Sequence, residues 1–169
     1  AQVGLCGLWV ATEGPRLFAP VPTGVGIDGI EPALSPARSL AVEADGLVIA
    51  DGRGRAQRIG RDGADRAPAF RLGAGLHDTE GLQREPEDTL LAVEDHPARL
   101  LRLSADGTSA AKRRGEDVAK SRREARGVAR DPPSGDVQVV DGDAGLNAVF
   151  AVSPDLALLS VTPLSEHGR

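Results

Sequence analysis

Aromatic side chains are scarce in this chain of 169 residues: they make up 2% of it, as one Trp, three Phe and no Tyr. Proteins that bind single-stranded nucleic acid stack the bases on aromatic rings, so this scarcity argues against a nucleic-acid platform. The formal net charge of −5 weakens the case for polyanion binding further. The hydrophobic content of 40% excludes wholesale disorder, so the core must be filled mainly by Leu, Val, Ile and Ala.

Cysteine and long apolar runs are also nearly absent. Cys6 is the single cysteine, so no disulfide can form within the chain, and its apolar neighbours indicate a buried thiol. No apolar run approaches the roughly 20 residues that span a bilayer, so no membrane span is predicted. The sequence starts at Ala1 instead of Met, as in a mature exported protein or a trimmed chain. A location outside the cytoplasm is slightly favoured, and the compartment stays open.

Familiar catalytic motifs are missing as well. His77, His96 and His167 lack the spacing of a zinc site. The chain contains neither a Gly-x-Ser-x-Gly elbow nor a P-loop, so no hydrolase nucleophile or phosphate cradle is supported. The one basic stretch, residues 112–126, is interrupted by acidic residues and is typical of a solvated loop or helix face.

A repeat of about 44 residues is the main feature that the sequence does contain. Each copy reads as an apolar run, a turn, a second apolar run that ends in an acidic residue, and a further run and turn. The copies include Leu40–Asp51, Gly81–Asp95 and Gly127–Asp141, and the closing acids are 44 and 46 residues apart. A partial copy, Leu8–Glu13, opens the chain. Self-similarity with this period is typical of repeat architectures.

The apolar runs predict β-strands. They are four to six residues long between Gly, Pro and Asp turns, and they are nearly continuous, as expected where both faces of a sheet are covered. We therefore predict an all-β fold, a β-propeller of about four blades of antiparallel sheet or part of one, as a single domain over residues 1–169. The predicted repeats run roughly over 1–36, 37–76, 77–122 and 123–169. A β-sandwich with accidental self-similarity is the alternative.

Two segments carry a family resemblance. Gly127–Asp141 looks like an NHL-type propeller repeat. Asp78-Thr-Glu-Gly-Leu82, followed by Thr89–Asp95 and Arg99–Arg102, resembles the SdiA-regulated and phytase-like (esterase-like) propeller groups. In those groups an Asp-x-Glu-Gly segment opens a blade and an acidic residue closes its second strand. The resemblance covers roughly residues 37–162 and implies a fold, because propellers host many unrelated activities.

This sequence also departs from those groups. The third repeat has Glu124-Ala125-Arg126-Gly127 where a Glu-Gly pair is expected, and the chain is shorter than the usual six-bladed ring.

Acidic residues are predicted to gather on one rim of the blades, because the first strand starts where the antiparallel second strand ends. Hard oxygen ligands favour Ca²⁺ or Mg²⁺ over zinc, and Ca²⁺ is the predicted cofactor. The predicted metal ligands are Glu80, Glu94, Asp95, Asp51, Asp141 and Glu13, and the predicted ligand-binding residues are Asp78, His96, Arg53, Arg55 and Arg99. Alternatively, an acid after the second strand accepts backbone N–H bonds from the following loop and needs no ligand.

Three functions fit these features. The favoured one is a binding module that takes a small-molecule or protein ligand at the acidic rim, together with a divalent cation. The second is a calcium-dependent hydrolase of a phosphoester, ester or lactone, with Glu80 or Glu94 as general base and Arg53, Arg55 and Arg99 as phosphate partners. The third is a structural or assembly role.

The repeat count leaves ring closure open. The chain could close by itself, with Leu158–Val161 beside the strand around Trp9; two chains could self-associate to complete a ring; or further blades could belong to a longer protein.

Overall fold

The computed structural model describes residues 10–11, 17–20, 27–30, 34, 37–60, 64–95, 99–108, 110–111, 125–142 and 147–164. These residues form strands in four antiparallel sheets, and within each sheet the strands follow one another in chain order. A 3-10 turn, η1 (Gly73–Gly75), is the only helical element in this part of the chain. No described helix is long and apolar enough to cross a membrane.

Three of the sheets are four-stranded meanders. The first contains β4 (Ala37–Val42), β5 (Gly46–Asp51), β6 (Arg55–Gly60) and β7 (Phe70–Arg71). The second contains β8 (Thr79–Arg84), β9 (Leu90–Glu94), β10 (Arg99–Leu103) and β11 (Ala110–Ala111). The third contains β12 (Ala125–Arg130), β13 (Val137–Asp141), β14 (Ala148–Val152) and β15 (Leu158–Pro163).

The remaining sheet has three strands: β1 (Val10–Ala11), β2 (Leu17–Pro20) and β3 (Ile27–Ile30). β3 starts at residue 27 and β7 at residue 70, 43 positions later, which is close to one repeat. By this spacing the three strands correspond to the second, third and fourth strands of the other sheets.

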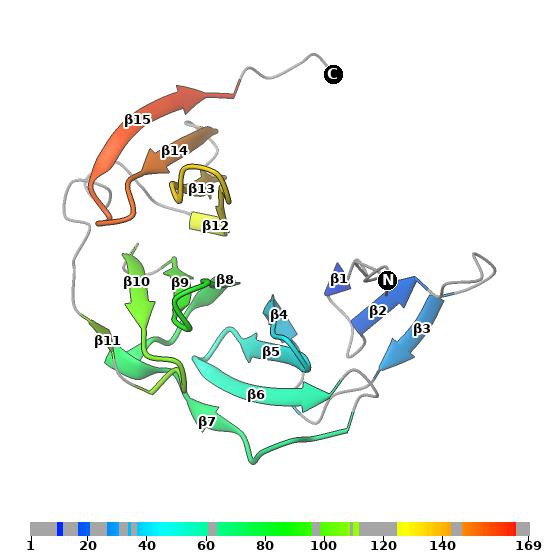
Figure 1. The fold of residues 1–169 in the computed structure, drawn as a ribbon. Coiled ribbons are helices and arrows are strands. Elements are labelled where there is room, and N and C mark those ends of the chain that lie inside the picture. Colours follow the sequence, from blue (N-terminus) through cyan, green and yellow to red (C-terminus); the bar gives the residue numbers. More distant parts are fainter. Residues whose placement is uncertain are drawn as a thin grey trace.

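The sheets are arranged radially, as Figure 1 shows. They follow an arc in which β4, β8 and β12 lie innermost, each beside the next, while β7, β11 and β15 lie outermost. Four-stranded antiparallel sheets arranged in this way are the blades of a β-propeller. The predicted fold class is therefore confirmed, and the alternative sandwich of two packed sheets is wrong.

Apolar layers between neighbouring blades form the core. One layer joins Val48, Ala50 and Ala56 of the β4–β7 blade to Leu82, Leu90 and Leu101 of the β8–β11 blade. A second layer joins Leu91, Val93 and Leu100 to Val137, Val139 and Phe150 of the β12–β15 blade. Because β5 and β9 are covered on both faces, all their residues are buried, which is why their sequences lack polar alternation.

The three inner strands β4, β8 and β12 each begin with a β-bulge at the same place, which allows their residues to be matched from blade to blade. Ala37 pairs with Asp51, Thr79 with Glu94 and Ala125 with Asp141, and in each case the register shifts at the next residue. The structural counterpart of Asp51 and Asp141 is therefore Glu94, not Asp95, the residue on which the predicted spacing was based. The three bulged residues are Arg38, Glu80 and Arg126.

The position of β15 bears on ring closure. This strand pairs with β14 and is the outermost strand of its own blade, so the predicted pairing of Leu158–Val161 with the N-terminal strand is wrong for the part of the chain that the structure describes. Trp9 lies outside the described residues.

Candidate binding site

The blades have two rims. The strand-end rim is where the second strands end, at Asp51, Glu94 and Asp141. The turn rim is opposite and carries the turns between the first and second strands, such as residues 43–45 and 85–89. The predicted site residues gather on the strand-end rim, whereas the pocket of the described chain opens on the turn rim.

Asp51 organises the loop that follows its own strand. Its carboxylate is 2% exposed and accepts hydrogen bonds from the backbone N–H groups of Arg53 (2.8 Å) and Arg55 (2.9 Å) and from Arg55 Nε (2.7 Å). Burial by itself raises the pKa of Asp51, but the bonds from Arg55 and Arg53 outweigh it and hold the pKa below its ordinary value. The loop is also tight, because Gly54 has a φ of +69° and a Cβ there would lie 1.7 Å from Leu76 O.

Glu94 has the same role in the next blade. Its side chain is fully buried, and Oε1 accepts a hydrogen bond from the backbone N–H of His77 (3.0 Å). Arg99, at the start of β10, forms an ion pair with Oε2 through Nε and Nη2. Arg99 occupies the position that Arg55 has in the preceding blade, so an acid and an arginine join the second and third strands in both blades. Ala148 stands at this position opposite Asp141.

Glu80 links two blades. Its Oε1 accepts a hydrogen bond of 2.7 Å from Arg38 Nη1, and both residues are the bulged positions of neighbouring inner strands. The Glu80 side chain is 11% exposed and that of Arg38 52% exposed, so this ion pair lies at the surface.

The other predicted site residues differ in burial and contacts. Asp95 and Asp141 are buried, the backbone of Asp78 accepts a hydrogen bond from Asp95 N (3.0 Å), and Arg53 is exposed. Glu13 and His96 lie outside the described residues. Among the described residues, no three His, Cys, Asp or Glu side chains are grouped closely enough to hold a metal ion. Calcium binding stays a prediction.

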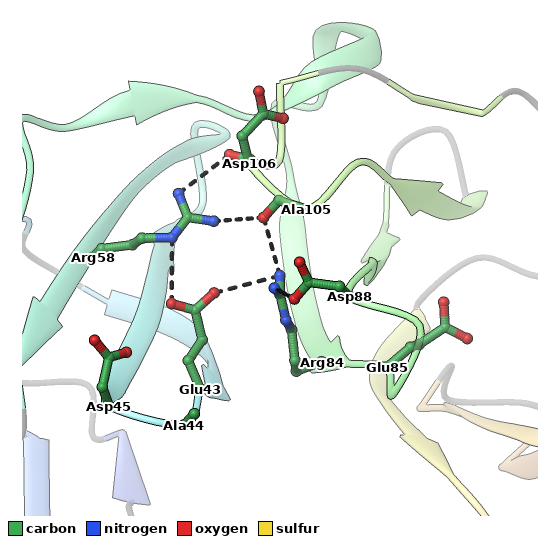
Figure 2. Close-up of a pocket in the computed structure, with 9 residues that line it drawn as sticks. All are labelled: Glu43, Ala44, Asp45, Arg58, Arg84, Glu85, Asp88, Ala105 and Asp106. Atoms are coloured by element: carbon green, nitrogen blue, oxygen red, sulfur yellow. Dashed lines mark hydrogen bonds and ion pairs between the residues drawn. The ribbon is translucent and has the colours of Figure 1, made fainter.

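The pocket on the turn rim has a volume of about 590 Å³ and lies between the β4–β7 and β8–β11 blades (Figure 2). Its lining comes from the first turn of each blade, from the end of β8, from Arg58 of β6 and from the β10–β11 turn. The lining residues are Glu43, Ala44, Asp45, Arg58, Arg84, Glu85, Asp88, Ala105 and Asp106.

Arg58 is fixed in this pocket by contacts with both blades. Its Nη2 donates to the carbonyl of Ala105 (2.7 Å) and its Nη1 to that of Asp106 (3.3 Å), while Nε donates to Glu43 Oε2 (3.3 Å). The guanidinium carbon also lies 5.1 Å from the centre of the Phe70 ring, within cation–π range.

Arg84 is held in the same way, as Figure 2 shows. Its Nη1 donates to the carbonyl of Ala105 (3.0 Å) and lies 3.4 Å from Glu43 Oε1, and its Nη2 pairs with Asp88. Glu43 thus bridges two guanidinium groups, one from each blade.

Glu85, which also lines the pocket, has a buried carboxylate. It is 3% exposed and accepts two hydrogen bonds from Arg102, from Nε (2.6 Å) and Nη2 (2.8 Å), and one from Thr89 Oγ1 (2.6 Å). Burial raises the pKa of Glu85, but the bonds from Arg102 and Thr89 are stronger and lower it below the ordinary value.

The most exposed charged side chains that line the pocket are acidic, and one of them, Asp45, pairs with Arg66 beside the pocket. The side chains of Asp45 and Asp88 are 69% and 75% exposed, against 24% and 19% for Arg58 and Arg84. Asp106 is exposed too, and hydrogen bonds from Ser104 Oγ and the Thr108 backbone N–H lower its pKa to about 2. Asp106 is therefore ionised at any physiological pH.

Sequence reasoning missed this pocket. The repeat predicts a turn after the third apolar run of each copy, and no function was attached to the turn at Asp106-Gly107, which the structure confirms. The sequence feature that could have indicated the pocket is an arginine at the same position of the third strand in two blades, Arg58 in β6 and Arg102 in β10.

Neither family models nor curated proteins match the chain. Solved structures do, and they are β-propellers. Virginiamycin B lyase from Staphylococcus aureus matches with a TM-score of 0.66 at 15% identity, over 94% of this chain and 52% of that one. A nidogen/laminin complex matches with a TM-score of 0.70 at 16% identity, over 96% of this chain and 62% of that one.

Glutaminyl cyclase from Myxococcus xanthus is a third similar structure, with a TM-score of 0.61 at 15% identity over 94% of this chain and 70% of that one. The chain spans about half the length of the virginiamycin B lyase that it matches. At these identities the likeness shows the β-propeller fold alone.

Proposed function

We propose that this chain is a non-catalytic β-propeller module whose turn-rim pocket binds a positively charged group of a partner, such as the lysine or arginine side chain of a basic peptide. The observation that carries this proposal is the division of charge in the pocket. Arg58 and Arg84 are held by Glu43 and by backbone carbonyls and are mostly buried, whereas Asp45, Asp88 and Asp106 are exposed at the mouth. Asp45 also pairs with Arg66, and Asp88 with Arg84, so a ligand cation would share these two carboxylates with an arginine. An incoming cation therefore meets carboxylates first, and the net charge of −5 attracts it from a distance.

The contacts on the strand-end rim favour binding over hydrolysis of a phosphoester. Of the three cations predicted to hold a phosphate, Arg55 and Arg99 are engaged by Asp51 and Glu94, and Arg53 is exposed. A substrate phosphate would have to displace these carboxylates from their arginines and leave them buried without a counter-ion, which is costly.

Isothermal titration with two probes of opposite charge tests the proposal. A tetralysine peptide should bind and a tetraglutamate peptide should not, and the affinity for tetralysine should fall as the salt concentration rises. Asp88→Asn and Asp106→Asn should each weaken tetralysine binding by roughly two- to fivefold, the range expected for a partly exposed ion pair.

Asp155→Asn is the matched control, because Asp155 is an exposed acid in the turn of a different blade. It should leave the affinity unchanged. If tetralysine bound equally well to all three variants, or if tetraglutamate bound as tightly, the pocket would not be the binding site.

A further inference from the structure

Asp45 and Asp88, two of the exposed carboxylates at the mouth of the turn-rim pocket, are each paired with an arginine of this chain. Arg66 pairs with Asp45, and Arg84 pairs with Asp88. The side chains of both acids are well exposed, so a partner can reach either of them. The two arginines differ in how firmly they are held, and an incoming cation therefore meets two different situations.

Arg84 is held by several groups at once. Its side chain is only 19% exposed, and besides its pair with Asp88 it uses Nη1, which donates to the carbonyl of Ala105 (3.0 Å) and lies 3.4 Å from Glu43 Oε1. If this guanidinium turned away from Asp88 toward solvent, it would also give up these two acceptors, and the loss of hydrogen bonds at a mostly buried site is costly. A cation that binds Asp88 must therefore share the carboxylate with Arg84.

Arg66 is fixed through its backbone but only lightly held through its side chain. Its N–H donates to the carbonyl of Arg58 (2.9 Å), and the N–H of Gly60 donates to the carbonyl of Ala64 (2.8 Å), so residues 64–66 run beside the end of β6. The Arg66 side chain is 45% exposed, and within the part of the chain that the structure describes its one polar contact is the pair with Asp45. An exposed ion pair of this kind contributes little to stability, so a partner can displace Arg66 from Asp45 at small cost.

Building on the proposed binding of a cationic group, we propose that Arg66 masks Asp45, so that a partner's cation has to displace this arginine before it can use the carboxylate. A cation that does so breaks one ion pair and forms another, and Asp45 therefore adds little to binding while Arg66 is present. Asp88 and Asp106, where no arginine has to leave, provide most of the attraction. Arg66 lies beside the pocket and acts through Asp45, which lines it.

Isothermal titration of tetralysine into variants of the chain tests this masking. Arg66→Gln should tighten the binding of tetralysine by roughly two- to fivefold, because pairing of Asp45 within the chain no longer reduces the apparent affinity. Arg71→Gln is the matched control, since Arg71 is an exposed arginine that lies opposite Arg55 at the strand-end rim. Its loss changes the net charge by the same amount but should alter the affinity by less than about 1.5-fold, because solvent and salt screen a distant exposed charge.

A double variant shows whether Arg66 acts through Asp45. In an Asp45→Asn background, Arg66→Gln should tighten binding by less than about 1.5-fold, because no masked carboxylate remains and the effects of two coupled residues do not add. The affinity of the single variant Arg66→Gln should also fall more steeply with salt than that of the unmodified chain, since binding at Asp45 then forms an ion pair instead of exchanging one.

The outcomes separate this masking from the proposed function. Equal binding of tetralysine by the unmodified chain and by Arg66→Gln would overturn the masking and leave the proposed function standing. An equal gain in Arg71→Gln, or an undiminished gain in the Asp45→Asn background, would also overturn it, because the gain would then come from charge alone. If tetralysine bound neither the unmodified chain nor any variant, the proposed function would be contradicted and the masking with it.

Discussion

Arg102 holds the buried Glu85 carboxylate with two parallel hydrogen bonds, Nε to Oε2 at 2.6 Å and Nη2 to Oε1 at 2.8 Å. The pair joins the third strand of its blade to the turn after the first strand. Arg58 and Glu43 are at the same positions in the preceding blade and form a looser pair, with Nε 3.3 Å from Oε2. The acid after the first strand and the arginine of the third strand therefore form a tight ion pair in the β8–β11 blade, whereas in the β4–β7 blade the looser pair leaves Glu43 free to contact Arg84 as well.

Glu85→Gln should destabilise the fold by about 2 kcal/mol, because it leaves the guanidinium of Arg102 without its counter-charge at a mostly buried site. The free energy of unfolding in urea measures this. Glu87→Gln is the control, since Glu87 is 63% exposed and its pair with Arg130 (3.3 Å) should contribute less than about 0.5 kcal/mol. Equal losses of unfolding free energy in the two variants would contradict the role of Glu85 as the buried ion-pair partner of Arg102.

Acid should destabilise the protein in a defined pH range. The pKa values of Asp51 and Glu85 are lowered in the folded state, so between their ordinary values and their folded values the unfolded chain binds more protons than the folded one. Their contribution is complete above about pH 4.5 and is lost as the pH falls through the folded pKa values. Urea midpoints between pH 7 and pH 2.5 should therefore fall mainly below about pH 4.5. The double variant Asp51→Asn, Glu85→Gln should show a flatter profile, and an equally steep one would contradict this origin.

Gly81→Ala and Gly127→Ala should have opposite effects although the two positions are equivalent. At Gly81 the new Cβ would push against the backbone of β12, so we expect a loss of about 1–3 kcal/mol. At Gly127 the space is open, so alanine should be neutral or should stabilise the strand by about 0.5 kcal/mol. Thermal unfolding at low protein concentration compares them. A similar loss of stability in both variants would show that the close packing of β12 on Gly81 is not the reason why alanine is unfavourable there.

The predicted calcium site can be tested by unfolding with and without the ion. Ca²⁺ that binds the folded chain in preference to the unfolded one raises Tm, and the rise should grow with concentration. Glu80→Gln, which removes a predicted ligand at the surface of the strand-end rim, should reduce the rise. A Tm that stays constant up to about 5 mM Ca²⁺, far above the dissociation constants of most extracellular calcium sites, would contradict calcium binding at this rim.

The sequence by itself determined the architecture, because that information is local and repeated. Apolar runs with few polar residues predicted strands covered on both faces, and β5 and β9 are buried along their whole length. The repeat predicted blades, and the acid at the end of the second strand predicted a fixed loop, which Asp51 supports with its bonds to Arg53 and Arg55. Each of these features involves residues close together in one blade.

Tertiary structure alone decided which residues meet between blades. Two adjacent acids stand at the end of the β9 strand, and spacing in the sequence selected Asp95, whereas the pairing of Thr79 with Glu94 shows that Glu94 is the counterpart of Asp51 and Asp141. The partners of Glu43 come from residues 15 and 41 positions away, Arg58 and Arg84, and only the packing of two blades brings them into one pocket. Gly81 and Gly127 look alike in the sequence, yet the backbone of β12 covers Gly81, while a Cβ on Gly127 would meet no atom of the described residues within 4 Å. Only the arrangement of the blades determines what lies beyond each strand.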